Sequence, residues 1–258
     1  MNYYFLVSGG RDSTAMVLQH HDEGKKGELV YGDTRLNSPA AKKVVERLAA
    51  YVNWPLHVVR YEGDKKPIVV LRESFMKIPQ AIAYMKKTGK FRRNMFKCCD
   101  TLKHRPMNEY IKALSEHFIR KTRFQRLLIF LRIRKERGEA CLVLGLKGSD
   151  SAIHRIYRMR QLRELDTFYR RHKSNGVLYY YPLRDATDSD VQEILDKHGF
   201  GDTHSSGCTI CPIFCMFESW RKKDPDAWRR SVQFANLLGI DFPAKGQTFI
   251  PELCKEVS

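Results

Sequence analysis

The chain has 258 residues, 43% of them hydrophobic, and this composition supports one large α/β domain or a core domain with a smaller appendage. No apolar run is long enough to span a membrane and no secretion signal precedes the first polar turn, so we expect a cytoplasmic protein without a membrane partner. Lys and Arg outnumber Asp and Glu by 46 to 29, which gives a formal net charge of +17. This excess favours a polyanionic partner, because it steers nucleic acid toward the surface.

Strand and helix patterns alternate along the chain. The predicted strands are 3–10, 27–34, 55–61, 140–146 and 176–183. The predicted helices are 13–24, 38–52, 106–117, a basic helix after 149–155, then 187–199 and 217–238. The helix at 187–199 has the clearest signals, because a Thr or Ser cap and an acidic first turn begin it and a glycine ends it. Residues 74–93 show an irregular, basic pattern. The β-α-β-α-β order predicts a doubly wound, parallel, Rossmann-like α/β sheet.

The first strand ends in the turn "SGGRDS", Ser8–Ser13, directly before a helix. Glycines let backbone N–H groups point at a phosphate, the helix N-terminus adds positive potential, and the two serine hydroxyls can donate to the same oxygens. The turn lacks the Gly-Lys-Ser/Thr ending of a Walker loop. It resembles the SGGxDS pyrophosphate loop (PP-loop) of the adenine nucleotide alpha hydrolase superfamily, whose members cleave ATP between its α- and β-phosphates and transfer AMP. Arg11 stands where relatives usually carry Lys, and it either clamps a phosphate or faces solvent.

Positive charge gathers in two segments. Residues 118–137 hold eight basic residues against one acidic, and residues 155–173 are nearly as dense. A solvated surface is the alternative, but the clustering favours a nucleic-acid face. We therefore predict a PP-loop nucleotide-binding domain over 1–200, with a basic helical insertion around 118–173. Residues 201–258 are predicted to form a cysteine loop, a helix and a C-terminal tail packed on the core.

The seven cysteines point to metal or redox chemistry, because disulfides are rare in a reducing compartment. Cys98-Cys99 and Cys208-x-x-Cys211 form two close pairs, and four thiolates suit either zinc or an iron–sulfur cluster. CC followed downstream by CxxC resembles the cluster-binding pattern of the adenylylsulfate reductases, in the PAPS reductase-like family of the same superfamily. This resemblance implies a 4Fe–4S cluster on the four cysteines, with zinc as the alternative.

Cys215 and Cys141 are not part of this set of four predicted ligands. Cys215 competes with Cys98 or Cys99 as a ligand, because some nucleic-acid thiolating relatives use a different set. Cys141 lies inside an apolar strand and is assigned to packing.

Three further segments extend the resemblance over about residues 4–220. They are "CCDTLKHRP" (98–106), "GLKGSDSAIHR" (145–155) and "YPLRDATDSDV" (181–191). The resemblance implies catalytic roles for Ser8, Asp12, Lys103 and Arg155. It implies nucleotide binding by Ser8, Gly9, Gly10, Arg11, Asp12, Ser13, Asp33 and Lys147. For Asp33, a turn cap at the end of a strand is the alternative. Lys147 stands where the family often has Arg, which is not equivalent for bidentate phosphate contact.

Two activities agree with these motifs. In the preferred one, an ATP pyrophosphatase adenylates an oxygen of DNA or tRNA, and sulfur then displaces AMP, as in DNA phosphorothioation and tRNA thiolation. This activity implies ATP, Mg²⁺, a nucleic-acid partner bound by the basic helices, and a cysteine desulfurase or another sulfur donor.

The alternative is an assimilatory sulfonucleotide (APS/PAPS) reductase that releases sulfite. Cys254 in "PELCKEVS" stands near the place of the reductase nucleophile, but the Gly and His that follow it in those enzymes are missing. The intact PP-loop also counts against reduction. A third hypothesis is a nucleic-acid-binding protein on an inactive enzyme scaffold. The sequence leaves open the choice of DNA or RNA and the oligomeric state.

Overall fold

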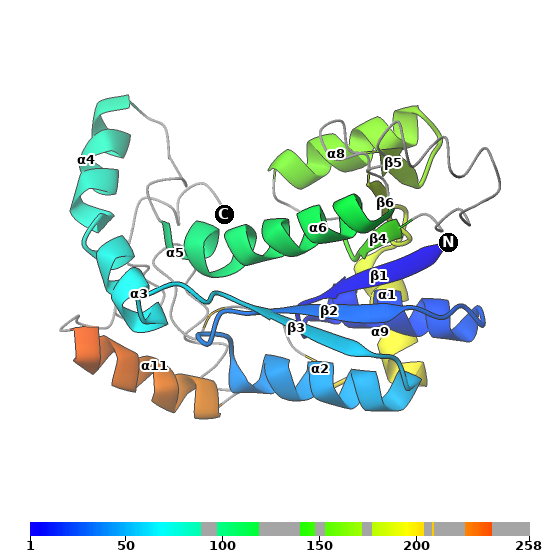
Figure 1. Cartoon of the computed structure of the whole chain (residues 1–258), viewed down its shortest axis with the longest axis horizontal. Helices are drawn as coiled ribbons and strands as arrows, with labels where there is room; N and C mark the ends of the chain where they lie inside the picture. Colours follow the sequence, from blue (N-terminus) through cyan, green and yellow to red (C-terminus); the bar gives the residue numbers. More distant parts are fainter. Residues whose placement is uncertain are drawn as a thin grey trace. The chain divides into compact units, whose positions relative to one another are not determined.

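The computed structural model describes residues 1–88, 97–118, 140–147, 153–171, 177–203, 208 and 225–238. Its sheet has six strands in the order β3-β2-β1-β4-β6-β5 (Figure 1). The strands are β1 (Asn2–Val7), β2 (Glu28–Asp33), β3 (Leu56–Arg60), β4 (Ala140–Leu144), β5 (Tyr169–Arg171) and β6 (Leu178–Tyr180). β1 pairs in parallel with β2 and β4, and β4 pairs in parallel with β6, whereas β5 is antiparallel to β6. The predicted α/β class is confirmed, with an antiparallel edge strand that the sequence did not indicate.

Ten helical segments connect or flank these strands in the described part of the chain. They are α1 (Arg11–Asp22), α2 (Pro39–Val52), α3 (Pro67–Phe75), α4 (Ile78–Thr88), α5 (Lys97–Cys99), the π-helix η2 (Asp100–His104), α6 (Arg105–Phe118), α8 (Ile153–Glu164), α9 (Asp188–Lys197) and α11 (Pro225–Leu238). None of the described helices is long and apolar enough to cross a membrane.

The irregular pattern predicted for 74–93 is wrong over 74–88, because α3 and α4 cover most of this stretch. Pro67 and Pro79 lie in the first turns of the two helices, where a missing N–H removes no helical hydrogen bond. Val70, Leu71 and Phe75 then bury one face of α3. The prolines therefore start these helices rather than interrupt them.

The two faces of the sheet are covered by different helices. Tyr180 of β6 packs against the core cluster that includes α1, α2 and α9, whereas its neighbour Tyr179 packs with Met159 and Leu162 of α8. Because successive side chains of a strand point to opposite faces, these helices lie on opposite sides of the sheet. This arrangement is the doubly wound architecture that the sequence predicted.

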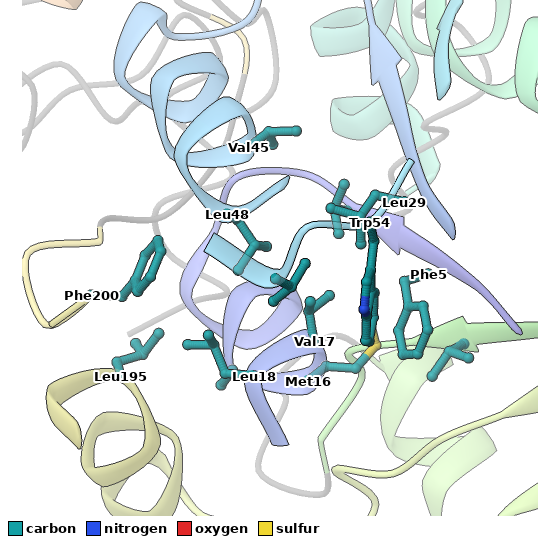
Figure 2. Packing of buried hydrophobic residues seen from close by; sticks show 14 of the residues in the cluster. Phe5, Met16, Val17, Leu18, Leu29, Val45, Leu48, Trp54, Leu195 and Phe200 are labelled. Carbon is teal, nitrogen blue, oxygen red and sulfur yellow. The ribbon is translucent and has the colours of Figure 1, made fainter. Parts of the chain in front are cut away.

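The main core lies where α1 meets the sheet, α2 and α9. Figure 2 shows Met16, Val17 and Leu18 of α1 in the middle of this cluster, and all three are fully buried. The rings of Phe5 and Trp54 lie beside them with centroids 4.9 Å apart. Burying a side chain of this size contributes about 1.5–3 kcal/mol, so the helix that follows the Ser8–Ser13 turn is firmly held.

Helix α9 is fixed at both ends by local signals. The Thr187 hydroxyl accepts a hydrogen bond from the Asp190 N–H, and the Asp190 carboxylate accepts one from the Thr187 N–H, so the two residues form a capping box. Gly199 follows the helix with a φ of 73°. These are the signals that predicted the helix.

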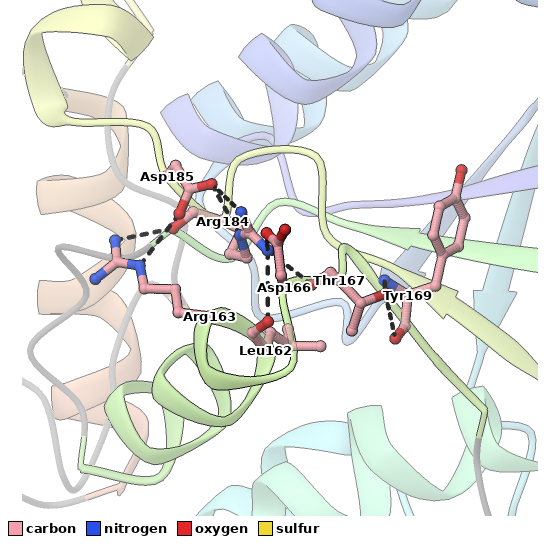
Figure 3. Close-up of polar contacts among 7 residues, drawn as sticks. All are labelled: Leu162, Arg163, Asp166, Thr167, Tyr169, Arg184 and Asp185. Atoms are coloured by element: carbon pink, nitrogen blue, oxygen red, sulfur yellow. Dashed lines mark hydrogen bonds and ion pairs between the residues drawn. The ribbon is translucent and has the colours of Figure 1, made fainter.

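A buried arginine links α8 to the segment before α9. Arg184 is 7% exposed, and its guanidinium donates to Asp185 and to the carbonyls of Leu162 and Thr167 (Figure 3). The same group lies 4.0 Å from the centroid of the Phe168 ring. Arg184 lies within "YPLRDATDSDV", and its contacts account for it as a structural residue.

The chain divides into two compact units. The first consists of Met1–Tyr31, Lys43–Val59 and Asn108–Ser205, and the second of Gly32–Lys42, Arg60–Met107 and Ser206–Ser258. The first contains the Ser8–Ser13 turn and the main core. The second has its own core cluster, which includes Leu36, Leu71, Phe75, Cys98 and Leu102. Of the described residues in the predicted 201–258 segment, 201–203 belong to the first unit, whereas 208 and 225–238 belong to the second.

Candidate functional site

The Ser8–Ser13 turn lies at the point where the strand order reverses. β2 and β3 follow one another on one side of β1, and β4 then pairs with β1 on its other side. In sheets of this kind, ligands bind beyond the carboxyl ends of the strands at such a switch point. Ser8 directly follows β1, and Gly145 directly follows β4. The topology thus brings the turn and Gly145–Lys147 together at the expected ligand position.

The turn leads directly into the positive N-terminal end of α1. Gly9 has a φ of 75°, which a residue with a side chain rarely adopts, and Gly10 is the extended N-cap residue without a side-chain cap. The Ser8 and Ser13 hydroxyls lie 3.1 Å apart, and the Ser13 hydroxyl donates to the Gly10 carbonyl at 2.9 Å. The first N–H groups of the helix have no partner within the helix itself, so this end suits an anion.

Gly145 lets β4 approach the turn closely. A Cβ placed on Gly145 would lie 2.8 Å from the Asp12 carbonyl oxygen and 2.9 Å from the Ser13 Cα. Both contacts are with backbone atoms, which cannot rotate away as a flexible side chain can. Gly145 is therefore required for the observed position of the turn.

Lys147 joins the turn to α9. Its Nζ donates to Asp12 Oδ1 at 3.0 Å and also to Asp188 Oδ1, while its side chain is only 10% exposed. Burial alone would lower the pKa of Lys147, but the hydrogen bonds that its Nζ donates to Asp188 and Asp12 outweigh this effect and raise the pKa. In turn, Lys147 lowers the pKa of Asp188. The ammonium group is a fixed positive charge between two carboxylates.

Arg11 also contacts α9. Its Nη2 donates to Gln192 Oε1 at 2.8 Å, and its Nε is buried with no hydrogen-bond partner among the described residues. The Arg11 side chain is partly buried and contacts α9, and its role toward a phosphate stays a prediction.

Asp33 ends β2, as predicted, and is 7% exposed. Its Oδ1 accepts the Arg35 N–H at 2.8 Å, and its Oδ2 accepts from Arg60 Nε at 3.0 Å. Arg35 has a φ of 58°, so the carboxylate stabilises a tight turn. The described contacts of Asp33 are those of a turn cap, and adenosine binding by this residue stays a prediction.

The cysteines come together in the second unit. Cys98 and Cys99 lie in α5, and both pack in the same hydrophobic cluster as Cys208. Cys98 donates its N–H to the buried Ser74 hydroxyl at 3.0 Å, and η2 follows directly. Short π-helices of this kind are frequent at functional sites. We call Cys98, Cys99 and Cys208 the cysteine cluster.

Cys208 lies against the turn that follows β2. Its backbone pairs with Asn37, and its sulfur lies 3.8 Å from the Thr34 hydroxyl. Burial raises the pKa of Cys208 and the nearby Cys99 raises it further, while Thr34 and the positive charge of Lys103 act in the opposite direction. Cys99 and Lys103 therefore lie close enough to Cys208 to influence its pKa.

The described residues include only part of the predicted thiolate ligand set. Three of the four predicted ligands share one packed cluster, whereas Cys211, Cys215 and Cys254 lie outside the described residues. Within the described residues, no three His, Cys, Asp or Glu side chains are grouped closely enough to hold a single metal ion. Cys141 is fully buried in β4, as a packing residue should be.

Two predicted groups lie partly or wholly outside the described side chains. Arg155 lies on α8, but its side chain is not among those described. The basic segment 118–137 falls almost entirely outside the described residues. Their roles therefore stay predictions.

Four residues of these sites were not predicted from the sequence. Gly145 and Asp188 contact the phosphate-loop region, and Thr34 and Ser74 contact the cysteine segments. Asp188 had a local signal as an acidic residue in a helix first turn, but nothing in its spacing pointed to Lys147. The hydroxyl residues lie far from the cysteines in sequence, so only the fold reveals their contacts.

No protein-family model and no curated protein matches the chain. Similar solved structures include phosphoadenylyl-sulfate (PAPS) reductase from Candida auris in a phosphate complex, at 15% identity and a TM-score of 0.43, covering 77% of this chain and 73% of that chain. They also include the U34-tRNA thiolase NcsA from Methanococcus maripaludis with its 4Fe–4S cluster, at 13% identity and a TM-score of 0.39, covering 97% and 76%.

Proposed function

We propose that the chain is a PP-loop ATP pyrophosphatase of the PAPS reductase-like family that adenylates a nucleic acid for sulfur insertion. The observation that carries this proposal is the glycine turn Ser8–Ser13 at the switch point between β1 and β4, in front of an uncapped helix N-terminus. A triphosphate is the ligand that this combination of N–H groups, hydroxyls and positive potential suits best.

The reaction has two displacements. A nucleic-acid oxygen attacks the α-phosphorus of ATP, and pyrophosphate leaves with the electron pair of the broken P–O bond. A sulfur nucleophile then attacks the adenylated centre, and AMP leaves with the oxygen. Because phosphoryl transfer depends mostly on positioning and charge neutralisation, the turn has to hold the β- and γ-phosphates as the leaving group.

The residues around the turn have different roles in binding the triphosphate. Ser8, Ser13 and the first N–H groups of α1 bind phosphate oxygens. Lys147 holds Asp12 in place, and Arg11 supplies a further positive charge beside α9. A bound Mg²⁺ would neutralise part of the triphosphate charge.

The cysteine cluster together with Cys211 would hold a 4Fe–4S cluster, or zinc in the alternative. When bound, the iron–sulfur cluster supplies a site that holds or relays sulfur. This chain contributes the packing that excludes water from Cys98 and the hydroxyl contacts of Ser74 and Thr34.

Nucleic acid is the proposed partner, and the described residues include part of its basic surface. Arg160 on α8 has a side chain 77% exposed, and Arg170 and Arg171 of β5 are also exposed. Contacts of this kind with phosphates make binding fall steeply with salt concentration.

Sulfur transfer is tested by supplying isotopically labelled cysteine, a cysteine desulfurase and nucleic acid, with and without ATP. Label should enter the nucleic acid only with ATP, and Ser13→Ala should reduce its entry. The competing reductase activity is assayed in parallel as sulfite release from adenylyl sulfate with thioredoxin. Sulfite release abolished by Cys254→Ser, without labelled nucleic acid, would show that the chain is a reductase.

A further inference from the structure

The edge strand β5 presents an accessible aromatic ring that is supported by a second ring. Tyr169 is 39% exposed, and its ring stacks on that of Tyr180 with centroids 4.5 Å apart and planes 12° apart. Such stacking covers one face of the Tyr169 ring. Because β5 is the last strand of the sheet on this side, the residue stays accessible from the sheet edge.

The backbone around this ring is held in place. The Tyr169 N–H donates to the Thr167 hydroxyl at 3.1 Å, and the Phe168 carbonyl accepts the Tyr181 N–H at 2.9 Å. The buried Arg184 donates to the Thr167 carbonyl at 3.1 Å and lies over the Phe168 ring. Figure 3 shows the Tyr169 ring pointing away from this network. A ring positioned in advance loses little conformational entropy when it binds a ligand.

The strand that carries Tyr169 is basic. Arg170 and Arg171 follow it, both are exposed, and β5 contains no acidic residue. Because successive side chains of a strand point to opposite faces, one arginine lies on each face of the sheet edge. The edge therefore combines an aromatic ring with positive charge, which is the combination that binds single-stranded nucleic acid.

The form of β5 counts against other occupants. It has only three residues, and very short, charged edge strands commonly protect a sheet from pairing with a further strand. Duplex nucleic acid also fits poorly, because its bases are already stacked on one another. Unpaired bases have a free face and stack on aromatic side chains, so they are the occupant that this edge suits.

The edge lies within reach of the phosphate-binding turn. In the sheet register, Tyr169 lies opposite Tyr180, which lies opposite Val143. Val143 in turn lies opposite Phe5, three residues before Ser8. From the spacing of strands and the rise per residue, Tyr169 is about 14 Å from the turn across the strands and about 10 Å along them. A single strand rises at least about 3.4 Å per nucleotide, so about five nucleotides span this distance.

We infer that Tyr169 is a stacking platform for an unpaired base of the nucleic-acid substrate, with Arg170 beside it contacting a phosphate of the same strand. This inference rests on the nucleic-acid part of the proposed function and makes it more specific. The substrate presents a loop or another unpaired segment within about five nucleotides of the modified atom.

The test measures binding of the full chain to two probes by fluorescence anisotropy. One probe is a labelled single-stranded DNA oligonucleotide of mixed sequence, and the other is the same strand annealed to its complement. Loss of one stacked base should make Tyr169→Ala bind the single strand roughly 5- to 150-fold more weakly, with duplex binding unchanged. Tyr169→Phe keeps the ring and should bind both probes as wild type does. Tyr51→Ala is the matched control, because Tyr51 is a 48% exposed tyrosine on α2.

Two further variants separate stacking from charge and from folding. Arg170→Gln should weaken binding of both probes alike and reduce the slope of log K against log salt concentration by about one. Wild-type behaviour of Arg170→Gln would overturn its phosphate contact. If Tyr169→Ala does not fold, Tyr169→Leu keeps apolar packing on Tyr180 without an aromatic face and should show the same selective loss.

The outcomes distinguish this inference from the proposed function. A wild-type chain that binds the single strand, with Tyr169→Ala matching it or weakened equally toward the duplex, would overturn the platform alone. A wild-type dimer that Tyr169→Ala converts to a monomer would also overturn it, because a second copy of the chain would then cover the edge. A folded wild-type chain that binds neither probe would overturn the platform together with the proposed nucleic-acid substrate.

Discussion

Replacing Gly145 by Ala should displace the phosphate-binding turn. The new Cβ would lie 2.8 Å from the Asp12 carbonyl oxygen, whereas ordinary contacts of this type begin at 3.4 Å, so the backbones must separate by about 0.6 Å. Overpacking of this kind costs typically about 1–3 kcal/mol of stability. Because a displacement near 1 Å can cost about 100-fold in a precisely positioned site, we expect ATP affinity to fall at least about tenfold.

Gly24→Ala provides the matched control. Gly24 has a φ of 68°, and no atom of the described part of the chain lies within 4 Å of its added Cβ, so alanine there is strained without touching the turn. The left-handed conformation should cost roughly 1–2 kcal/mol. Calorimetric titration with ATP and thermal unfolding of both variants then separate stability from binding. The reasoning is refuted if Gly145→Ala binds ATP like wild type, or if Gly24→Ala loses as much affinity.

Three further outcomes follow from single contacts. His20 is buried, which lowers its pKa below the ordinary 6.5, so the unfolded state binds the proton more readily than the folded state. The free energy of unfolding should therefore decrease as pH falls below 6.5. In urea titrations, His20→Phe should flatten this dependence. Asp188→Asn removes an exposed partner of Lys147, so it should change the free energy of unfolding by less than about 1 kcal/mol. It should nevertheless weaken ATP binding measured by calorimetry. An unchanged ATP affinity would contradict the role of Asp188 in positioning Lys147. Thr187→Ala removes the capping box with Asp190 and should cost about 1 kcal/mol in urea unfolding, and no loss would contradict the cap assignment.

The elements that the sequence predicted well have strong local causes. α9 combines the Thr187 cap, acidic residues in its first turn and Gly199 after its end. β1 and β4 are apolar runs buried in the sheet, and the glycine turn after β1 lies where a phosphate-binding loop belongs. Each of these signals lies within a few neighbouring residues, so no long-range information is required.

The elements that the sequence missed depend on distant contacts. β5 has three exposed residues, and only its pairing with β6 makes it a strand. Lys147 was predicted to meet phosphates, but its partnership with Asp188 depends on how the α9 N-terminus packs. The contact between Thr34 and Cys208 joins residues 174 positions apart. Such contacts leave no periodic pattern in the sequence.

The most direct test of the proposed function is the position at which ATP is cleaved. The purified chain is incubated with ATP labelled on the α-phosphate and with DNA or tRNA, and the nucleotide products are separated. Labelled AMP should accumulate with an equal amount of pyrophosphate, and it should depend on the nucleic acid. Cleavage to ADP and phosphate, or no AMP with any nucleic acid, would contradict the account.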